Sequence, residues 1–125
     1  MILLDTDIII DYLRGNPEAL RFVDELTEAP ATSVIVVAGL YAGVRDGSER
    51  DKLEALLAGT RLFPLTIAGS VEGGLYRRQF GKSHGVGLDD CLIAATAQLE
   101  GAKLVTLNRK HYPMLSDVLV PYLKS

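Results

Sequence analysis

Acidic and amide side chains recur in this sequence at points where an apolar segment ends or a helix begins. Asp5 follows a short apolar run, Asp89 and Asp90 precede another, and Asn108 follows a third. Because the carboxyl ends of parallel strands meet at one edge of a sheet, we expect these side chains to gather there. Carboxylates held together without a cationic partner repel one another unless a hard cation joins them. The pattern therefore predicts a metal site at that edge.

These acids also have structural interpretations. Asp5 could cap the helix that follows it, although Thr6 and Asp7 are able to do the same. For this reason we favour metal ligation for Asp5. Asp89 and Asp90 suit the first turn of a helix, where carboxylates interact favourably with the helix dipole. For Asp89 and Asp90, the sequence leaves open both metal ligation and interaction with the helix dipole.

The other polar candidates are weaker. Asn108 could simply start a turn after its strand. His84 and His111 are isolated and lack the spacing of metal ligands, so a surface position is expected for each. Cys91 lies in an apolar helix and is expected to pack as a small core side chain. Basic residues around Arg77–Lys82 and at Arg109-Lys110 are expected on solvated faces, with phosphate contact as the alternative for these and for Arg14.

Alternating apolar strands and amphipathic helices must position these residues. The pattern predicts an α/β fold with a mainly parallel central sheet flanked by helices. Expected strands span 2–4, 31–33, 62–65, 103–107 and 118–120. Expected helices span 8–14, 17 to about 28, 34–44, 49–58, 66–83 and 90–100. Four glycines weaken the fifth of these helices, and Ser48 with Asp51 resembles a capping box for the fourth.

Composition limits the class of protein. The 125 residues are 48% apolar and 23% charged, which suits one domain, residues 1–125, with a sizeable core. A net charge of −3 argues against general binding of polyanions. One cysteine allows no disulfide within the chain and fits a reducing, cytoplasmic compartment. The acidic start is unlike a signal peptide, and the apolar runs are too short for a membrane span.

Four segments, in order along the chain, resemble the PIN-domain ribonucleases, most closely the VapC-type toxins of toxin–antitoxin pairs. They are Leu3-Leu4-Asp5-Thr6-Asp7 through Gly15, Thr32-Ser33-Val34 through Gly43, Leu88-Asp89-Asp90 through Ala97, and Leu104-Val105-Thr106-Leu107-Asn108 through Tyr112. The resemblance covers nearly the whole chain. It implies a PIN-like fold and places the family's catalytic acids at Asp5 and Asp90. Asn108 matches a further polar position.

The sequence departs from the family pattern at Gly39, where the family carries a second acid, a glutamate. Glycine inside a helix costs about 1 kcal/mol relative to alanine, so its presence needs a reason. One explanation is close packing of the helix against a neighbour. We prefer the other, which is loss of an acidic ligand and attenuation of the activity.

The resemblance implies a metal-dependent endoribonuclease that cleaves RNA with Mg²⁺ or Mn²⁺. Asp5 and Asp90 would be the principal ligands, Asp89 and Asn108 would hold metal-bound waters, and Asp7 is a weaker candidate. It also implies a homodimer and a VapB-type antitoxin that carries the DNA-binding role. A catalytically silent PIN-like binding module and a PIN nuclease of RNA processing are the alternatives. Gly39 favours the first of these.

Overall fold

A computed structural model describes residues 1–124 of the chain and shows an α/β fold built on a five-stranded sheet. The strands are β1 (Ile2–Leu4), β2 (Ala31–Ser33), β3 (Arg61–Phe63), β4 (Lys103–Val105) and β5 (Val118–Leu119). Their order across the sheet is β3-β2-β1-β4-β5, and every neighbouring pair is parallel. The predicted fold class is confirmed. The last residue of the predicted domain, Ser125, lies outside the described residues.

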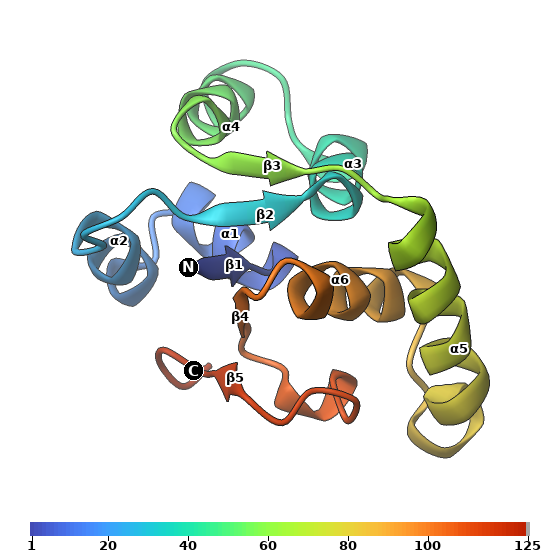
Figure 1. Ribbon diagram of the computed structural model, residues 1–125. Helices are drawn as coiled ribbons and strands as arrows, with labels where there is room; N and C mark the ends of the chain where they lie inside the picture. Colours follow the sequence, from blue (N-terminus) through green and yellow to red (C-terminus); the bar gives the residue numbers. More distant parts are fainter. Residues whose placement is uncertain (125) are drawn as a thin grey trace.

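Six helices surround the sheet (Figure 1). They are α1 (Thr6–Leu13), α2 (Pro17–Asp24), α3 (Val34–Gly43), α4 (Ser48–Ala58), α5 (Ile67–His84) and α6 (Leu88–Leu99), with a short 3-10 helix, η1 (Arg109–His111). Helix α5 packs mainly along the outer side of α6. Within residues 1–124, no helix is both long enough and apolar enough to cross a membrane.

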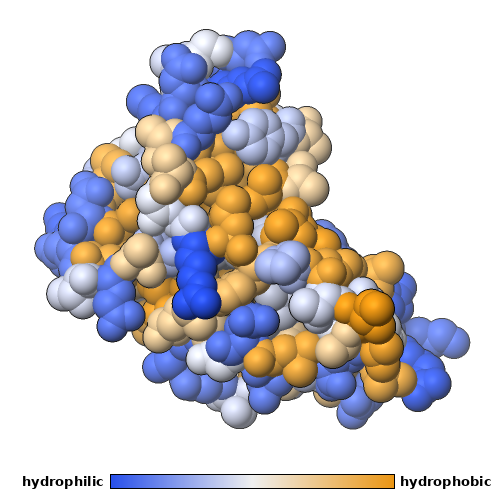
Figure 2. All heavy atoms as spheres, turned by 45° about the horizontal axis from the view of Figure 1, so that its top comes forward, coloured by the Kyte–Doolittle hydropathy of each residue, from blue (hydrophilic) through white to orange (hydrophobic). Residues whose placement is uncertain are grey.

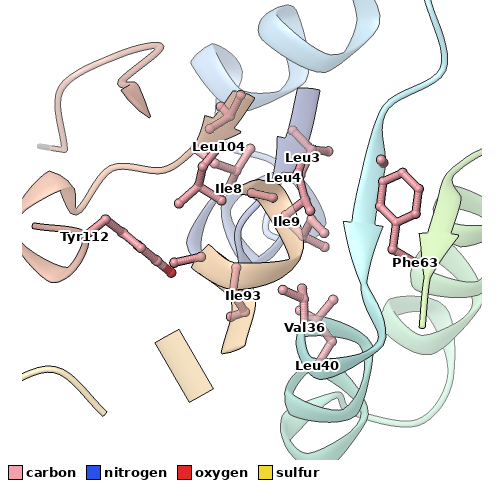
Figure 3. Close-up of a cluster of buried hydrophobic side chains, with 14 of the residues drawn as sticks. Leu3, Leu4, Ile8, Ile9, Val36, Leu40, Phe63, Ile93, Leu104 and Tyr112 are labelled. Carbon is pink, nitrogen blue, oxygen red and sulfur yellow. The ribbon is translucent and has the colours of Figure 1, made fainter. Parts of the chain in front are cut away.

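Strands β1 and β4 form the middle of the hydrophobic core (Figure 3). Leu3, Leu4, Leu104 and Val105 are almost fully buried, as expected for strands covered on both faces. Each such side chain contributes about 1.5–3 kcal/mol through its burial. Helices α1, α3 and α6 complete the core with Ile8, Ile9, Val36, Leu40 and Ile93. The carboxyl ends of β1 and β4 are thereby fixed against the starts of α1 and α6.

Several element ends differ from the sequence prediction. Strand β3 ends at Phe63 because Pro64 has no N–H to donate to the ladder. Strand β4 ends at Val105. The Thr106 N–H still donates to the Leu119 carbonyl oxygen, but the Leu107 N–H turns away and donates to the Asp7 side chain of α1. Helix α2 ends at Asp24 rather than near Glu28, with the following N–H groups closing a short turn. These differences shorten elements without changing the topology.

One helix prediction needs correction, and one is confirmed. Ser48 does not cap α4: Gly47 is the N-cap residue, with φ of 96°, and makes no side-chain capping bond. The helix predicted at 66–83 is confirmed as α5, which runs for 18 residues despite its four glycines. Gly73 faces α6, where an added Cβ would come within 2.6 Å of Leu92 Cδ2, so close packing between the two helices explains this glycine. At Gly69 the closest atoms are Thr66 Oγ1 at 3.3 Å and Leu65 Cδ1 at 3.4 Å, at the start of α5 itself.

Candidate active site

Asp5 lies at the junction of β1 and α1 and is only 7% exposed. It is the N-cap residue of α1, and its Oδ1 accepts the Thr6 N–H at 2.7 Å. Its Oδ2 accepts hydrogen bonds from the hydroxyl groups of Thr106 and Tyr112, both at 2.8 Å. Asp5 therefore occupies the capping position while its other oxygen is held by two neutral donors from the far end of the chain.

Asp90 lies in the first turn of α6, across from Asp5. Its Oδ1 accepts a hydrogen bond of 3.2 Å from the same Tyr112 hydroxyl that contacts Asp5. Its Oδ2 lies 3.2 Å from Nδ1 of His111. The amide nitrogen of Asn108 lies 3.2 Å from the other ring nitrogen of His111. Asp5, Tyr112, Asp90, His111 and Asn108 thus form one connected polar cluster.

Asp7 fastens the start of α1 to the turn that follows β4. Its Oδ2 accepts the Leu107 N–H at 2.9 Å and the Thr106 hydroxyl at 3.1 Å, and its Oδ1 accepts the Ile8 N–H. Because Thr106 donates to both Asp5 and Asp7, the two carboxylates lie close together. Asp7 therefore has a structural role at the edge of the site.

A groove of about 590 Å³ opens at the carboxyl ends of the central strands. It brings together the acids and the amide predicted for the metal site. Its polar lining comprises Asp5, Thr6, Asp7, Asp89, Asp90, Asn108 and His111. Gly39 lines the same groove from α3. Side chains from four separate segments therefore meet in one place.

Gly39 faces open space. A Cβ built at this position would meet no atom within 4 Å, apart from its own helical turn and neighbours. Nothing in residues 1–124 packs against Gly39, so close packing within the chain does not explain this glycine. A longer side chain at position 39 would extend beside Asp5 and Asp90, since all three residues line the groove.

The groove is electrostatically unfavourable for its own carboxylates. Burial raises the pKa of Asp5, and the charge of Asp90 adds to this, although hydrogen bonds from Tyr112 and Thr106 oppose the shift. Burial and the charge of Asp5 raise the pKa of Asp7. Burial and the charge of Asp89 raise the pKa of Asp90, against the opposing influence of His111. A cation in the groove would relieve all three carboxylates.

The donor set fits a hard cation, but it is sparse. Mg²⁺ and Mn²⁺ favour oxygen ligands and retain several waters, so two carboxylates with nearby amide and carboxylate groups can hold one. Among residues 1–124, no three Asp, Glu, His or Cys side chains converge as a ready cage. The groove thus offers the chemistry of a metal site with fewer charged ligands than a closed cluster would have.

Sequence reasoning missed two contributors to this site, Thr106 and Tyr112, which received no functional assignment. His111 is exposed at the surface, as expected, but it also lines the groove and contacts Asp90. The turn after β4 and η1 fold back and bring all three against the carboxylates. A threonine and a tyrosine flanking Asn108 were the available signal, because buried hydroxyl groups near a predicted acid need partners.

The basic residues lie elsewhere. Among residues 1–124, His111 is the only basic side chain that lines the groove, and it carries a positive charge only when it is protonated. Arg109 donates to the Val118 carbonyl oxygen at 3.3 Å. Arg14 lines a separate hollow near α4. Phosphate contacts by these arginines stay a prediction.

Comparison with known proteins gives a consistent family. Residues 2–114 match the PIN domain family. Ribonuclease VapC19 of Mycobacterium tuberculosis is 40% identical over 126 residues, covering 98% of this chain and 100% of the relative. Ribonuclease VapC10 of the same organism is 38% identical over 125 residues, covering 98% and 93%.

Solved structures with the same fold include toxin–antitoxin complexes. One, a toxin–antitoxin complex from Klebsiella pneumoniae, superposes with a TM-score of 0.85 at 24% identity, covering 99% of this chain and 100% of that chain. Another, VapBC2 from Rickettsia felis bound to a DNA fragment from its promoter, gives 0.76 at 25% identity, covering 95% and 96%. At 24% identity, the likeness to the Klebsiella complex supports the fold alone.

Proposed function

The chain belongs to the PIN-domain family as a VapC-type ribonuclease of a toxin–antitoxin pair, and from that premise we propose that its acidic groove cleaves RNA with a divalent cation. The single observation that carries the proposal is the meeting of Asp5, Asp90 and Asn108 in one groove. PIN-domain ribonucleases generally depend on divalent metals, which fits the oxygen-rich lining. We also propose that the whole chain acts as one domain.

In this proposal Asp5 and Asp90 are the principal ligands. When bound there, Mg²⁺ or Mn²⁺ supplies an activated water and charge relief at the phosphate. Asp89 and Asn108 line the groove beside Asp90 and are placed to hold and orient ordered waters. Thr106 fixes Asp5 through its hydroxyl group, so that the carboxylate does not rotate away from the groove.

We propose further that Gly39 attenuates the activity. Position 39 opens into the groove, so an acid there would add a third carboxylate to Asp5 and Asp90. Without it, cation affinity and water activation are both weaker. We therefore expect slow cleavage by the chain as it stands.

The test is cleavage of total tRNA and ribosomal RNA in Mg²⁺ or Mn²⁺ by three proteins. They are the present chain, Gly39→Glu, and Gly39→Glu combined with Asp90→Asn. We expect Gly39→Glu to raise the rate by about 100-fold or more, on the scale of losing one electrostatic contact in an active site. The second substitution should abolish that gain.

A matched control separates charge in the groove from charge in general. Ala58 is exposed at the end of α4 and does not line the groove. Ala58→Glu should leave cleavage unchanged. Equal rates for the present chain and Gly39→Glu would contradict the attenuation. No cleavage by any variant, with antitoxin still bound, would favour the silent binding module.

The partners we propose are RNA as substrate and a VapB-type antitoxin. The antitoxin follows from the family and from the VapBC complexes among the structural neighbours. An arginine of the antitoxin could pair with the groove carboxylates as a cation does. The Rickettsia complex was solved with promoter DNA, and we assign any such DNA contact here to the antitoxin.

We also propose that the protein is a homodimer. Helix α3 has no charged residue, yet Val34 and Tyr41 are exposed. On α5, Ile67, Val71 and Leu75 form an exposed stripe at four-residue spacing. Apolar side chains gather over the side of the molecule where α3 and α5 lie (Figure 2). Such a face is normally covered in solution.

Analytical ultracentrifugation tests this arrangement. The present chain should sediment as a dimer, and Val71→Glu should sediment as a monomer because it places a charge inside the apolar face. Val71 is exposed, so the substitution should leave the fold intact. A monomeric parent protein at micromolar concentration would contradict the proposal.

A further inference from the structure

Tyr112 links the two principal acids of the groove. Its hydroxyl group donates to Asp5 Oδ2 at 2.8 Å and lies 3.2 Å from Asp90 Oδ1. The three residues come from the end of β1, the first turn of α6 and the segment after η1. Within residues 1–124, no other side chain hydrogen-bonds to both carboxylates.

The tyrosine reaches these carboxylates from the core. Its ring is 1% exposed, belongs to the hydrophobic cluster, and does not line the groove. Figure 3 shows the side chain extending from the segment after η1, with its hydroxyl end directed toward α6. Asp5 and Asp90, by contrast, do line the groove. The hydroxyl group therefore contacts both carboxylates from the side of the core, away from the groove that they line.

The hydroxyl group is a constant donor. A tyrosine hydroxyl group is protonated, and therefore a neutral donor, at physiological pH. It is neutral, so it orients the carboxylates without neutralising them. A cationic partner in the same place would compete with a metal ion for the same charges. A tyrosine thus positions the ligands and preserves their attraction for a cation.

We propose that Tyr112 is a positioning residue that holds Asp5 and Asp90 at the spacing required to share one divalent cation. This inference rests on the proposed metal-dependent function. It gives the tyrosine a role in cation affinity, beyond the packing of its ring. The role is important in this chain because Gly39 leaves two principal carboxylates to hold the cation.

Tyr122 provides a matched control. Its hydroxyl group donates to Asp11 Oδ2 at 2.9 Å, so it makes the same type of bond outside the groove. Tyr112→Phe and Tyr122→Phe each remove a hydroxyl group that contacts aspartate and keep the ring. Tyr112→Phe should cost more stability, because its hydroxyl group is buried and that of Tyr122 is only partly buried. Only a positioning role predicts that they differ in cation binding.

The experiment is a Mn²⁺ titration followed by electron paramagnetic resonance on the full-length parent, Tyr112→Phe, Tyr122→Phe and Asp90→Asn. We expect Tyr112→Phe to weaken Mn²⁺ binding by about ten-fold or more, with Tyr122→Phe equal to the parent. Equal affinity in Tyr112→Phe and the parent, with loss in Asp90→Asn, would overturn the positioning role alone. Parent affinity unchanged by Asp90→Asn would overturn the cation site itself.

A second measurement uses the parent protein, in case Tyr112→Phe does not fold. With ¹³Cζ-labelled tyrosine, adding Mg²⁺ should shift the NMR signal of Tyr112 and leave that of Tyr122 in place. The cation changes the electron density of the carboxylates that accept the Tyr112 hydrogen bond. A Tyr112 signal that stays fixed at saturating Mg²⁺ would overturn the proposal.

Discussion

Gly39 and Gly73 lie inside helices of the same molecule, but their surroundings are opposite. A Cβ on Gly73 would come within 2.6 Å of Leu92 Cδ2 and 3.1 Å of Leu92 Cα, so α5 and α6 can approach closely only because the residue is glycine. A Cβ on Gly39 would meet nothing within 4 Å. Helix packing therefore requires glycine at position 73 but not at position 39.

The difference separates structural from functional reasons for a costly residue. Glycine in a helix interior costs about 0.5–1 kcal/mol relative to alanine. At Gly73 the close contact between α5 and α6 offsets that cost. At Gly39 no contact offsets it, and the position opens onto buried carboxylates. The reason for Gly39 is therefore to be sought in the chemistry of the groove.

The largest effect on stability is expected for Gly73→Leu. Because the Cα of Leu92 is part of the backbone, it cannot move aside as a side-chain end can, and α5 must shift away from α6. We expect the free energy of unfolding to fall by about 3 kcal/mol or more. Urea denaturation measures the change. Gly74→Leu, which meets open space on the same helix, is the control and should not show this loss.

The second prediction concerns stabilisation by cations in Gly39→Glu. A third carboxylate should bind Mn²⁺ more tightly, and binding at 100 times the dissociation constant adds about 2.7 kcal/mol. Thermal unfolding with and without Mn²⁺ should therefore show a larger shift for Gly39→Glu than for the parent. Ala58→Glu, which adds a charge on α4 away from the groove, should behave as the parent does. A larger shift in Ala58→Glu would mean that added charge acts without regard to the groove.

The third prediction concerns pH in the absence of metal. The folded-state pKa of Asp5 is raised, so the folded protein holds that proton more tightly than the unfolded chain. Ionised Asp5 therefore lowers stability at neutral pH, and this cost is relieved as the pH falls toward the raised pKa. Urea denaturation in EDTA should show a modest rise in stability on mild acidification.

Asp5→Asn is the control for this pH dependence. It removes the ionisable group and keeps an oxygen that can accept from Thr106 and Tyr112. On acidification, the stability of the variant should rise less than that of the parent. The rise that is left reflects Asp7 and Asp90, whose pKa values are also raised. An identical rise in the parent and the variant would show that Asp5 is not responsible.

The sequence was sufficient for the sheet and for the acids at its edge. Apolar runs followed by polar residues mark the ends of parallel strands, so Asp5, Asp90 and Asn108 could be placed together before any coordinates. The bridge from Tyr112 could not be predicted from the residues alone. It depends on η1 turning the chain back into the core, and a three-residue helix leaves no periodic signal.

The role of Gly39 could be predicted in part. Its neighbours indicated a helix, which α3 confirms, but the sequence left open whether a second helix packs against the glycine. Only the arrangement of α3 around the groove decides between the two explanations. For the same reason, the sequence could not explain Gly73 of α5, because the residue that requires it, Leu92, lies nineteen positions later in α6. Contacts of this kind are set by tertiary packing.

The smallest effect is expected for Gly39→Ala, which tests the comparison most directly. The substitution adds a Cβ in open space and no charge, so the free energy of unfolding should rise by about 0.5–1 kcal/mol through helix propensity alone. RNA cleavage should not change, because alanine supplies no ligand. Gly73→Ala should do the reverse and destabilise, since its Cβ meets Leu92. If Gly39→Ala lowered stability instead, position 39 would be a packing glycine after all, and the argument for a lost acid would fail.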